Sequence, residues 1–375
     1  MEDSTLNRVS LAGCERYHPE TVKKAMCDLL EPFGGIKGIV SPGQKVLLKP
    51  NLLAAAPPAE AVTTHPLIVK VVTGMIHDAG GKVFIGDSPG SDDQKTALRV
   101  SGLLDVIEET GSNMLLFKTV KHKMVEGFRK RSFPLAAELD QVDLVINMGK
   151  LKTHSLTGLT GAVKNIYGCL IGGSKKKYHM DYPLPLDFSR LLIDVYLAVR
   201  PAFSILDAVV AMEGAGPRRG KPRRLGLLMA SPNAVALDSI AAEITGFVPE
   251  QVTTIAAARM LRLPGSDRSG IEIKGLTLEQ CRVPDFDRGP ASSGSVSRLI
   301  ARFPIAYFRN ILYARRPYPR VNEELCSGCG ICYEKCPAQV IDFSRSIPDI
   351  DHYECIRCYC CQELCPQGAI DLNKS

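Results

Sequence analysis

Two cysteine runs near the carboxyl end are the most informative part of this sequence. Residues 326–337 read CSGCGICYEKCP, and residues 355–366 read CIRCYCCQELCP. Both runs have the spacing C-x2-C-x2-C-x3-C followed by proline. This is the spacing of bacterial chains that hold two iron–sulfur cubanes, in which the fourth cysteine of each run ligates the other cluster. The sequence therefore predicts two [4Fe–4S] clusters and an electron-transfer role.

The crossing of the fourth cysteine assigns the expected ligands. One cluster is expected on Cys326, Cys329, Cys332 and Cys365. The second cluster is expected on Cys355, Cys358, Cys361 and Cys336. The similarity continues past the cysteines, because residues 336–342 (CPAQVID) resemble residues 365–371 (CPQGAID). A duplicated, ferredoxin-like half-module is therefore expected.

Structural zinc is the alternative, since paired C-x2-C knuckles often bind it. Each run has a third cysteine after its C-x2-C pair, however, and a zinc site of four ligands does not account for these additional cysteines. Cys360 fits neither run. We expect it to be a small buried thiol rather than a ligand, because free cysteine commonly packs as a hydrophobic residue.

The bulk composition indicates a soluble, reduced protein with a large body. About 290 to 320 residues remain outside the cysteine module, enough for one large or two medium domains. The acidic start of the chain has no apolar run, and no stretch of about 18 uninterrupted apolar residues occurs. Because iron–sulfur ligands must be reduced thiols, we predict a cytoplasmic location.

The charge is distributed unevenly. The formal net charge is +6, but residues 321–375 contain four Lys or Arg and nine Asp or Glu. The body is therefore basic and the module acidic. No single basic stripe accompanied by aromatic residues is present, which argues against a nucleic-acid partner. A basic body favours a small anionic substrate.

Strands alternate with helices along the first half of the chain. Apolar runs at residues 45–49, 82–86 and 142–147 read as buried strands, and residues 66–76 and 96–110 read as helices. This alternation predicts an α/β fold, a mostly parallel sheet with helices on both faces. The module should add a small α+β ferredoxin-like unit.

Polar residues cluster after these strands, where ligands of parallel sheets commonly bind. Three lysines, a histidine and an asparagine fall between residues 150 and 165. Lysine ammonium groups in a dry cleft would hold an anion, and histidine would transfer protons. The candidate site residues are Lys49, Asn51, His65, Asp87, Lys150, Lys152, His154, Lys164, Asn165 and His179.

These motifs resemble the DUF362 family. The resemblance rests, in order, on KPNL at 49–52, THP at 64–66, GDSP at 86–89, KLKTH at 150–154, Lys164-Asn165 with Gly168, His179, EGAGP at 213–217 and AVALD at 234–238. It covers roughly residues 5 to 285. Because the family is defined by a domain of unknown function, the resemblance implies the fold and the candidate site but no reaction.

We expect three segments: an α/β domain at 1–285, a connector at 286–320 and a two-cluster ferredoxin domain at 321–375. Residues 297–320 contain six arginines and no acid. They could contact an anionic membrane surface, but a connector packed on the body is the favoured interpretation.

Two functional hypotheses follow. The first is an oxidoreductase that acts on a small anion, with electrons supplied by a soluble donor or a redox partner protein through the clusters. The second is a non-enzymatic, ferredoxin-like electron carrier whose large domain docks a redox partner. A third, in which the clusters are only structural, is disfavoured by the acidic module.

Overall fold

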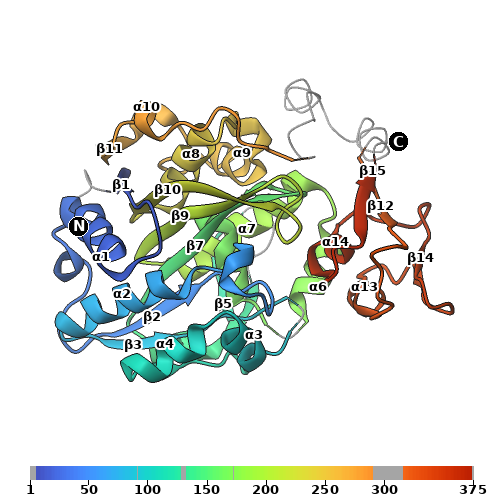
Figure 1. Ribbon diagram of the computed structural model, residues 1–375, viewed down its shortest axis with the longest axis horizontal. Helices are drawn as coiled ribbons and strands as arrows, with labels where there is room; N and C mark the ends of the chain where they lie inside the picture. The colour runs from blue at the N-terminus through green and yellow to red at the C-terminus, as the bar shows by residue number, and fades with distance from the viewer. Residues whose placement is uncertain (1–5, 91, 128–131, 172, 290–315, 374–375) are drawn as a thin grey trace.

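A nine-stranded sheet forms the centre of the large body (Figure 1). The computed structural model describes residues 6–90, 92–127, 132–171, 173–289 and 316–373. The strand order is β11-β1-β10-β9-β7-β2-β3-β4, and β8 pairs with β7. These strands are β1 Arg8–Gly13, β2 Lys45–Pro50, β3 Lys82–Ile85, β4 Asn113–Met114, β7 Leu144–His154, β8 Gly158–Thr160, β9 Phe203–Glu213, β10 Lys221–Ser231 and β11 Glu272–Gly275.

The sheet is mostly parallel. Strands β4, β3, β2, β7 and β9 run parallel to one another, and so do β1 and β11. The antiparallel pairs are β9 with β10, β10 with β1, and β7 with β8. The central strand β7 is buried at every position after its first residue, as expected for a central strand of a parallel sheet, and this burial includes its polar residues. The predicted α/β fold is confirmed.

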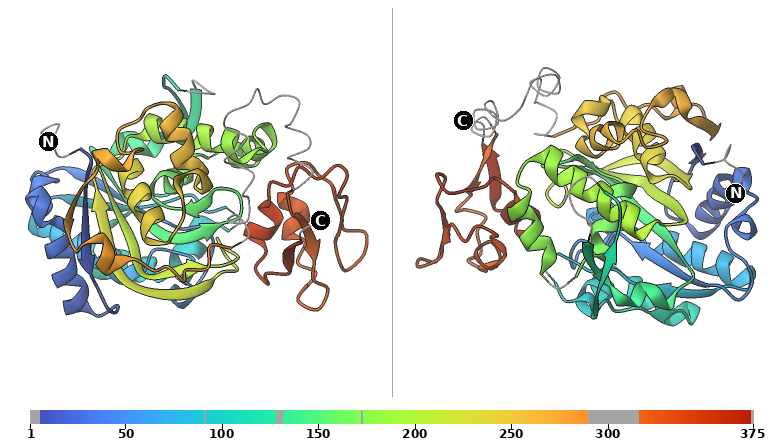
Figure 2. Two further views of the ribbon diagram at one scale, coloured as in Figure 1. Left: turned by 90° about the horizontal axis from the view of Figure 1, so that it is seen from above. Right: turned by 180° about the vertical axis from the view of Figure 1, so that it is seen from behind.

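Helices cover both faces of the sheet (Figure 2). One face packs on α1, α2, α3 and α4, and the other packs on α5, α7, α8 and α9. Alternate residues of β10 point to opposite faces, since Leu228 lies in the first core and Leu227 and Met229 lie in the second. The body's helices are α1 Pro19–Leu30, α2 Pro66–Asp78, α3 Gln94–Val100, α4 Leu103–Thr110, α5 Ala162–Asn165, α6 Ser174–Asp181, α7 Pro185–Val199, α8 Ala234–Ile244, α9 Thr253–Met260 and α10 Leu278–Cys281.

Several elements differ from the sequence prediction. The helix expected over residues 96–110 is divided into α3 and α4, because Gly102 adopts a left-handed conformation with φ 73°. Strand β7 continues to His154, so Lys150 and Lys152, expected beyond the end of the strand, lie within it. The apolar pattern also did not indicate β1, α7 or the hairpin of β5 (Val120–Met124) and β6 (Ser132–Ala136).

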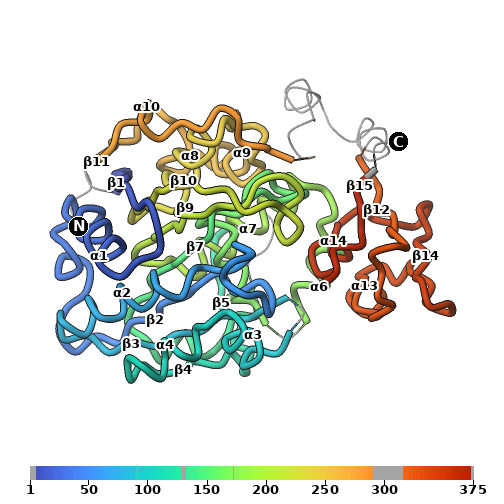
Figure 3. Tube along the Cα trace, viewed as in Figure 1, coloured from blue at the N-terminus to red at the C-terminus, as the bar shows by residue number. Residues whose placement is uncertain are grey.

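The cysteine module packs against one end of the body, as the tube in Figure 3 also shows. It contains α13 Ile331–Lys335, α14 Cys360–Leu364, β12 Tyr318–Val321, β13 Ile341–Asp342, β14 Asp349–Ile350 and β15 Ile370–Asn373. Tyr359 joins the apolar core formed by Phe133, Tyr178 and Phe188 of the body. The module is therefore anchored by apolar burial as well as by polar contacts.

Polar contacts extend along the same interface. Arg219 Nη1 lies 2.6 Å from Asp371 Oδ1 and donates to the carbonyl of Ile370. Ser155 Oγ donates to Gln362 Oε1 at 2.8 Å. Because these contacts come from different segments of the body, they fix the orientation of the module.

The arginine-rich segment at residues 297–320 was considered as a membrane contact and favoured as a connector, and its residues 297–315 lie outside the described part of the chain. Within the described part of the chain, no helix combines the length and apolarity that crossing a bilayer requires. Arg316, near the end of the segment, donates to the carbonyls of Pro183 in the body and Arg357 in the module.

Gly86 offers a test of the fold beside the candidate site. A Cβ atom there would lie 2.1 Å from the carbonyl oxygen of Leu115, whereas a Cβ at Gly74 in α2 meets nothing within 4 Å. Gly86→Ala should lower the free energy of unfolding by about 1–3 kcal/mol through overpacking. Gly74→Ala should raise it by about 0.5–1 kcal/mol, because alanine favours the helix. Unfolding midpoints of both variants check this, and an equal effect of the two substitutions would contradict the packing described for Gly86.

Candidate functional site

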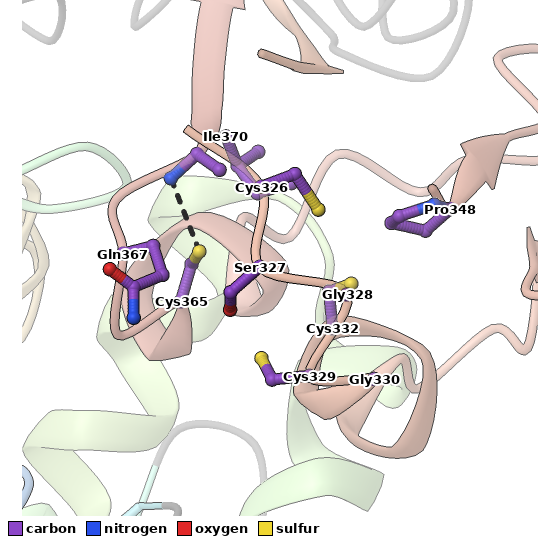
Figure 4. A pocket seen from close by; sticks show the side chains of 11 residues that line it. Cys326, Ser327, Gly328, Cys329, Gly330, Cys332, Pro348, Cys365, Gln367 and Ile370 are labelled. Carbon is purple, nitrogen blue, oxygen red and sulfur yellow. Dashed lines mark hydrogen bonds between the residues drawn. The ribbon is translucent and has the colours of Figure 1, made fainter. Parts of the chain in front are cut away.

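The cysteines of the first predicted cluster surround one space. Cys326, Cys329, Cys332 and Cys365 line a single pocket together with Gln367 and Pro348. Figure 4 shows their four sulfur atoms arranged around this space, with Cys365 arriving from the second run. Across the described residues, no three His, Cys, Asp or Glu side chains are spaced to hold a single metal ion. The donor set of four thiols fits the predicted cubane.

The four cysteines of the second predicted cluster are shielded from solvent to different degrees. Cys336, Cys358 and Cys361 are buried, and Cys355 is partly buried. Backbone amides donate to two of the predicted ligand sulfurs, from Ala369 to Cys365 at 3.2 Å and from Arg357 to Cys355 at 3.4 Å. Such bonds are one of the means by which a protein tunes a cluster's reduction potential.

A cavity of about 120 Å³ lies between the body and the module. The body contributes residues that follow β2 and β3, together with side chains from β8, α5 and α6. The module contributes Lys335 from α13 and Cys360, Glu363 and Leu364 from α14. Five of the predicted site residues line the cavity: Asn51, Asp87, Lys164, Asn165 and His179.

Glu363 carries a carboxylate from the module into the body. Its Oε1 lies 3.7 Å from Lys164 Nζ, and its Oε2 lies 3.4 Å from His154 Nε2. Burial alone would raise the Glu363 pKa, but the Lys164 ammonium holds it well below its usual value. Glu363 therefore stands as a carboxylate that partly neutralises the buried Lys164.

His154 is a neutral partner in this arrangement. Its Nδ1 accepts from the amides of Leu156 at 3.0 Å and Thr157 at 3.3 Å. The ring proton of the neutral form is therefore on Nε2, facing Glu363. Burial, together with the charge of Lys164, lowers the His154 pKa to about 4. His154 is not among the residues that line the cavity, and it contacts the cavity wall through Glu363.

Two buried polar groups lining the cavity have unused hydrogen-bonding capacity. His179 Nδ1 and Thr160 Oγ1 are both buried without a hydrogen-bond partner among the described residues. The His179 ring stacks on Phe188 at 4.3 Å, and burial lowers its pKa to about 4. Buried polar groups are rarely left unpaired, so these two indicate a place for a ligand or ordered water.

Lys49 lies behind the cavity rather than in its wall. Its Nζ forms a buried ion pair with Asp87 Oδ1 at 2.8 Å. Asp87 Oδ2 also accepts from the amide of Leu52 at 2.9 Å. Because a Cβ atom on Gly168 would lie 1.9 Å from Asp87 Oδ1, only glycine leaves room for this pair.

Lys150 and Lys152 also do not reach the cavity, contrary to the expectation of a cleft lined by four lysines. Lys152 Nζ donates to Asn51 Oδ1 at 3.0 Å and to the carbonyl of Val62 at 2.7 Å. Lys150 Nζ pairs with Asp207 at 2.9 Å. The reason is that both lysines lie in β7, whose side chains are enclosed by neighbouring strands and by the helices on the sheet faces.

A chain of amide side chains connects these buried groups to the cavity wall. Asn51 Nδ2 donates to Asn165 Oδ1 at 2.9 Å, and Asn165 Nδ2 donates to Asn147 Oδ1 at 2.8 Å. Asp238 accepts from the amides of Ala162 and Val163 at the start of α5. Asp238 therefore orients the short helix that presents Lys164.

His65 lies apart from the cavity in a second polar group. Its ring stacks on Tyr17 at 3.6 Å, and its backbone amide donates to Asp207 Oδ2 at 3.0 Å. Tyr17 Oη donates to Asp207 Oδ1 at 2.8 Å and accepts from Lys150 Nζ at 2.9 Å. These groups satisfy one another, so His65 is placed as a structural residue at the start of α2.

Sequence reasoning missed several cavity residues. Glu363 is hidden between two predicted cluster cysteines, and Lys335 lies beside another. Lys175 and Lys176 belong to a run of three lysines, a pattern typical of a solvated surface, although both line the cavity and Lys175 donates to the carbonyl of Ser88. The acidic composition of the module was the sequence signal for Glu363, because a carboxylate on the module could pair with a cation of the basic body. Cys360 is buried, as predicted, and lines the cavity.

The environment of His65 predicts a pH effect on stability. Burial lowers its pKa from 6.5 to about 4, so the unfolded chain binds a proton there before the folded protein does. The stability that the neutral ring contributes is present above pH 6.5 and is lost as the pH falls towards 4. His65→Asn keeps an N-cap for α2, and its free energy of unfolding should fall less than that of the wild type when the pH is lowered. The difference should be on the order of 1 kcal/mol, because partial exposure of the ring reduces the effect. Unfolding midpoints of both proteins from pH 7 to 4.5 check this, and parallel curves would contradict it.

Comparison with known proteins gives a family match. The model of a domain of unknown function, DUF362, matches residues 46–243, and that of a 4Fe–4S dicluster domain matches residues 318–366. A thylakoid-associated protein of Synechocystis sp. is 35% identical over 256 residues, which cover 68% of this chain and 79% of that protein.

Two solved structures are similar to part of the chain. The lactate racemase apoprotein of Thermoanaerobacterium thermosaccharolyticum has 11% identity and a TM-score of 0.42, covering 65% of this chain and 58% of that one. A Thermotoga maritima protein has 13% identity and a TM-score of 0.40, covering 63% and 60%. The chain thus spans less than two thirds of either, and neither likeness bears on its function. From the family match and the Synechocystis relative, the chain belongs to the DUF362 family, and it carries a 4Fe–4S dicluster domain at its carboxyl end.

Proposed function

We propose that this iron–sulfur electron-transfer protein is an oxidoreductase whose substrate is a small anion bound between the body and the cluster module. The observation that carries the proposal is the shared cavity. One wall presents Lys164, Thr160 and His179, and the facing wall is α14, which lies between predicted cluster ligands. When bound, two [4Fe–4S] clusters would supply single electrons beside this cavity.

The body's residues have distinct roles in this proposal. Lys164 would bind the anion, because its ammonium is buried and its nearest Glu363 oxygen, at 3.7 Å, lies beyond hydrogen-bonding distance. Thr160 and His179 would complete the contacts with the groups they leave unpaired. Lys49, Lys152 and the asparagine chain would hold Asp87 and Asn51 in the wall. Such fixed dipoles and charges act more strongly on an anion in a site that excludes water.

A second candidate function is a carrier whose large domain docks a redox partner. The surface of the module favours a partner protein. Of its nine acidic residues, Glu363 is buried and Asp371 pairs with Arg219. The other seven are exposed: Glu323, Glu324, Glu334, Asp342, Asp349, Asp351 and Glu354. This surface suits a basic electron donor. Because either function would use such a donor, the two candidate functions are distinguished by whether a ligand binds in the cavity.

The ligand assignment predicts the metal content of two variants. The anaerobically purified protein should contain roughly eight iron and eight sulfide per chain, as two cubanes require. Cys361→Ser should lose up to half of this iron, whereas the neighbouring Cys360→Ser should keep it, because Cys360 is assigned no iron. Iron, zinc and sulfide analysis checks both. Zinc in place of iron, or equal iron loss in the two variants, would contradict the ligand assignment.

The cavity predicts anion binding that depends on Lys164. Lys164→Gln should weaken binding of inorganic phosphate or succinate by roughly 10- to 100-fold, since a hydrogen bond to a charged group contributes about 1.5–3 kcal/mol. Anaerobic calorimetry measures the affinities, and the visible absorption of the clusters should stay unchanged.

Lys23→Gln is the matched control, because Lys23 is exposed on α1, and no residue of α1 lines the cavity. It should bind both anions as the wild type does. If neither probe binds the wild type, or if Lys164→Gln binds as well as Lys23→Gln, the oxidoreductase proposal fails and the carrier function is favoured.

A further inference from the structure

The five-residue helix α14 belongs to both the cavity and the cluster module. Cys360, Glu363 and Leu364 line the cavity, while Cys361 and Cys365 come from the two predicted ligand sets. Tyr167, also in the cavity wall, has its pKa raised by burial and by the nearby thiols of Cys360 and Cys358. A negative charge added to a cluster on these cysteines would therefore lie close to a ligand bound in the cavity.

The charges around the cavity favour a ligand with two negative charges. Four lysines line it, Lys164 from α5, Lys175 and Lys176 from α6, and Lys335 from α13. The two acids in the wall are Asp87, which Lys49 already neutralises, and Glu363. One carboxylate is left against four ammonium groups, so a dianion such as a phosphate or a dicarboxylate matches the cavity better than a monoanion.

We propose that the cavity is a dianion site whose affinity depends on the redox state of the iron–sulfur centres held beside it, with the oxidised protein binding more tightly. The proposal rests on the function proposed above. Each electron taken up from a one-electron donor adds one negative charge to the module, and this charge repels the bound dianion. Because coupling between two sites is reciprocal, the bound dianion makes the centres harder to reduce and stronger as reductants.

The expected size of the coupling follows from electrostatics. At an effective dielectric constant of about 20, two unit charges on the order of 10 Å apart change a binding constant by more than about tenfold, and a dianion doubles the interaction energy. Salt reduces this effect less for buried charges than for exposed ones. A tenfold change in affinity corresponds to a shift of about 59 mV in a one-electron potential.

The experiment compares phosphate and succinate binding to oxidised and to reduced full-length protein. Electrochemical reduction with uncharged mediators avoids anionic reductants that would compete for the cavity. We expect both dianions to bind the reduced protein at least about tenfold more weakly, and saturating phosphate to lower the midpoint potential by at least about 59 mV. Acetate should bind at least tenfold more weakly than succinate.

Glu363→Gln provides a second variant that keeps the shape of the side chain. Removing this negative charge should tighten dianion binding in both redox states, while the ratio of the oxidised-state affinity to the reduced-state affinity should not change. Equal affinities in the two states, with binding that still depends on Lys164, would overturn the redox coupling and leave the proposed function standing. Acetate binding as tightly as succinate would overturn the dianion class. Absence of binding by every probe in both states would overturn both proposals.

Discussion

Among the contacts that hold the module on the body, that of Glu363 with Lys164 and His154 is the one that links the module to the cavity. It brings a carboxylate from the cysteine-bearing helix into the wall of a cavity formed by the body. Removing one member of a buried charge pair typically costs about 3–5 kcal/mol, because the other is left uncompensated. Neither part is therefore electrostatically complete alone. This dependence ties the position of α14, and of the predicted cluster ligand Cys361 on it, to the proposed anion site of the body.

A second constraint acts inside the body, where three lysines of the family motifs are fully buried. Lys49, Lys150 and Lys152 lie within strands, and each pairs with an acid, an amide or a carbonyl oxygen. An unpaired buried ammonium would cost several kcal/mol, so these partners are as necessary as the lysines. The result is a rigid polar interior that holds Asn51 and Asp87 in the cavity wall. Rigid placement of this kind lowers the reorganisation needed when a ligand binds.

Much of the fold can be predicted from sequence patterns, whereas the candidate site can be predicted only in part. The apolar patterns of residues 45–49, 66–76 and 82–86 indicated β2, α2 and β3, because periodicity acts locally. Half of the predicted site residues line the cavity, and Lys150 and Lys152 do not because β7 runs past the expected end of the strand. Glu363 and Lys335 could not be assigned from sequence, since their role depends on how the module docks. Docking is a long-range contact that local patterns do not encode.

The central claim is that an anion held by Lys164 lies beside the iron–sulfur centres. Pulsed electron–nuclear double resonance of the electrochemically reduced protein, with saturating inorganic phosphate, measures this proximity directly. The account predicts a dipolar coupling between the phosphorus nucleus and the paramagnetic centre, lost in Lys164→Gln. Phosphate that binds stoichiometrically to the reduced protein but shows no coupling would contradict it.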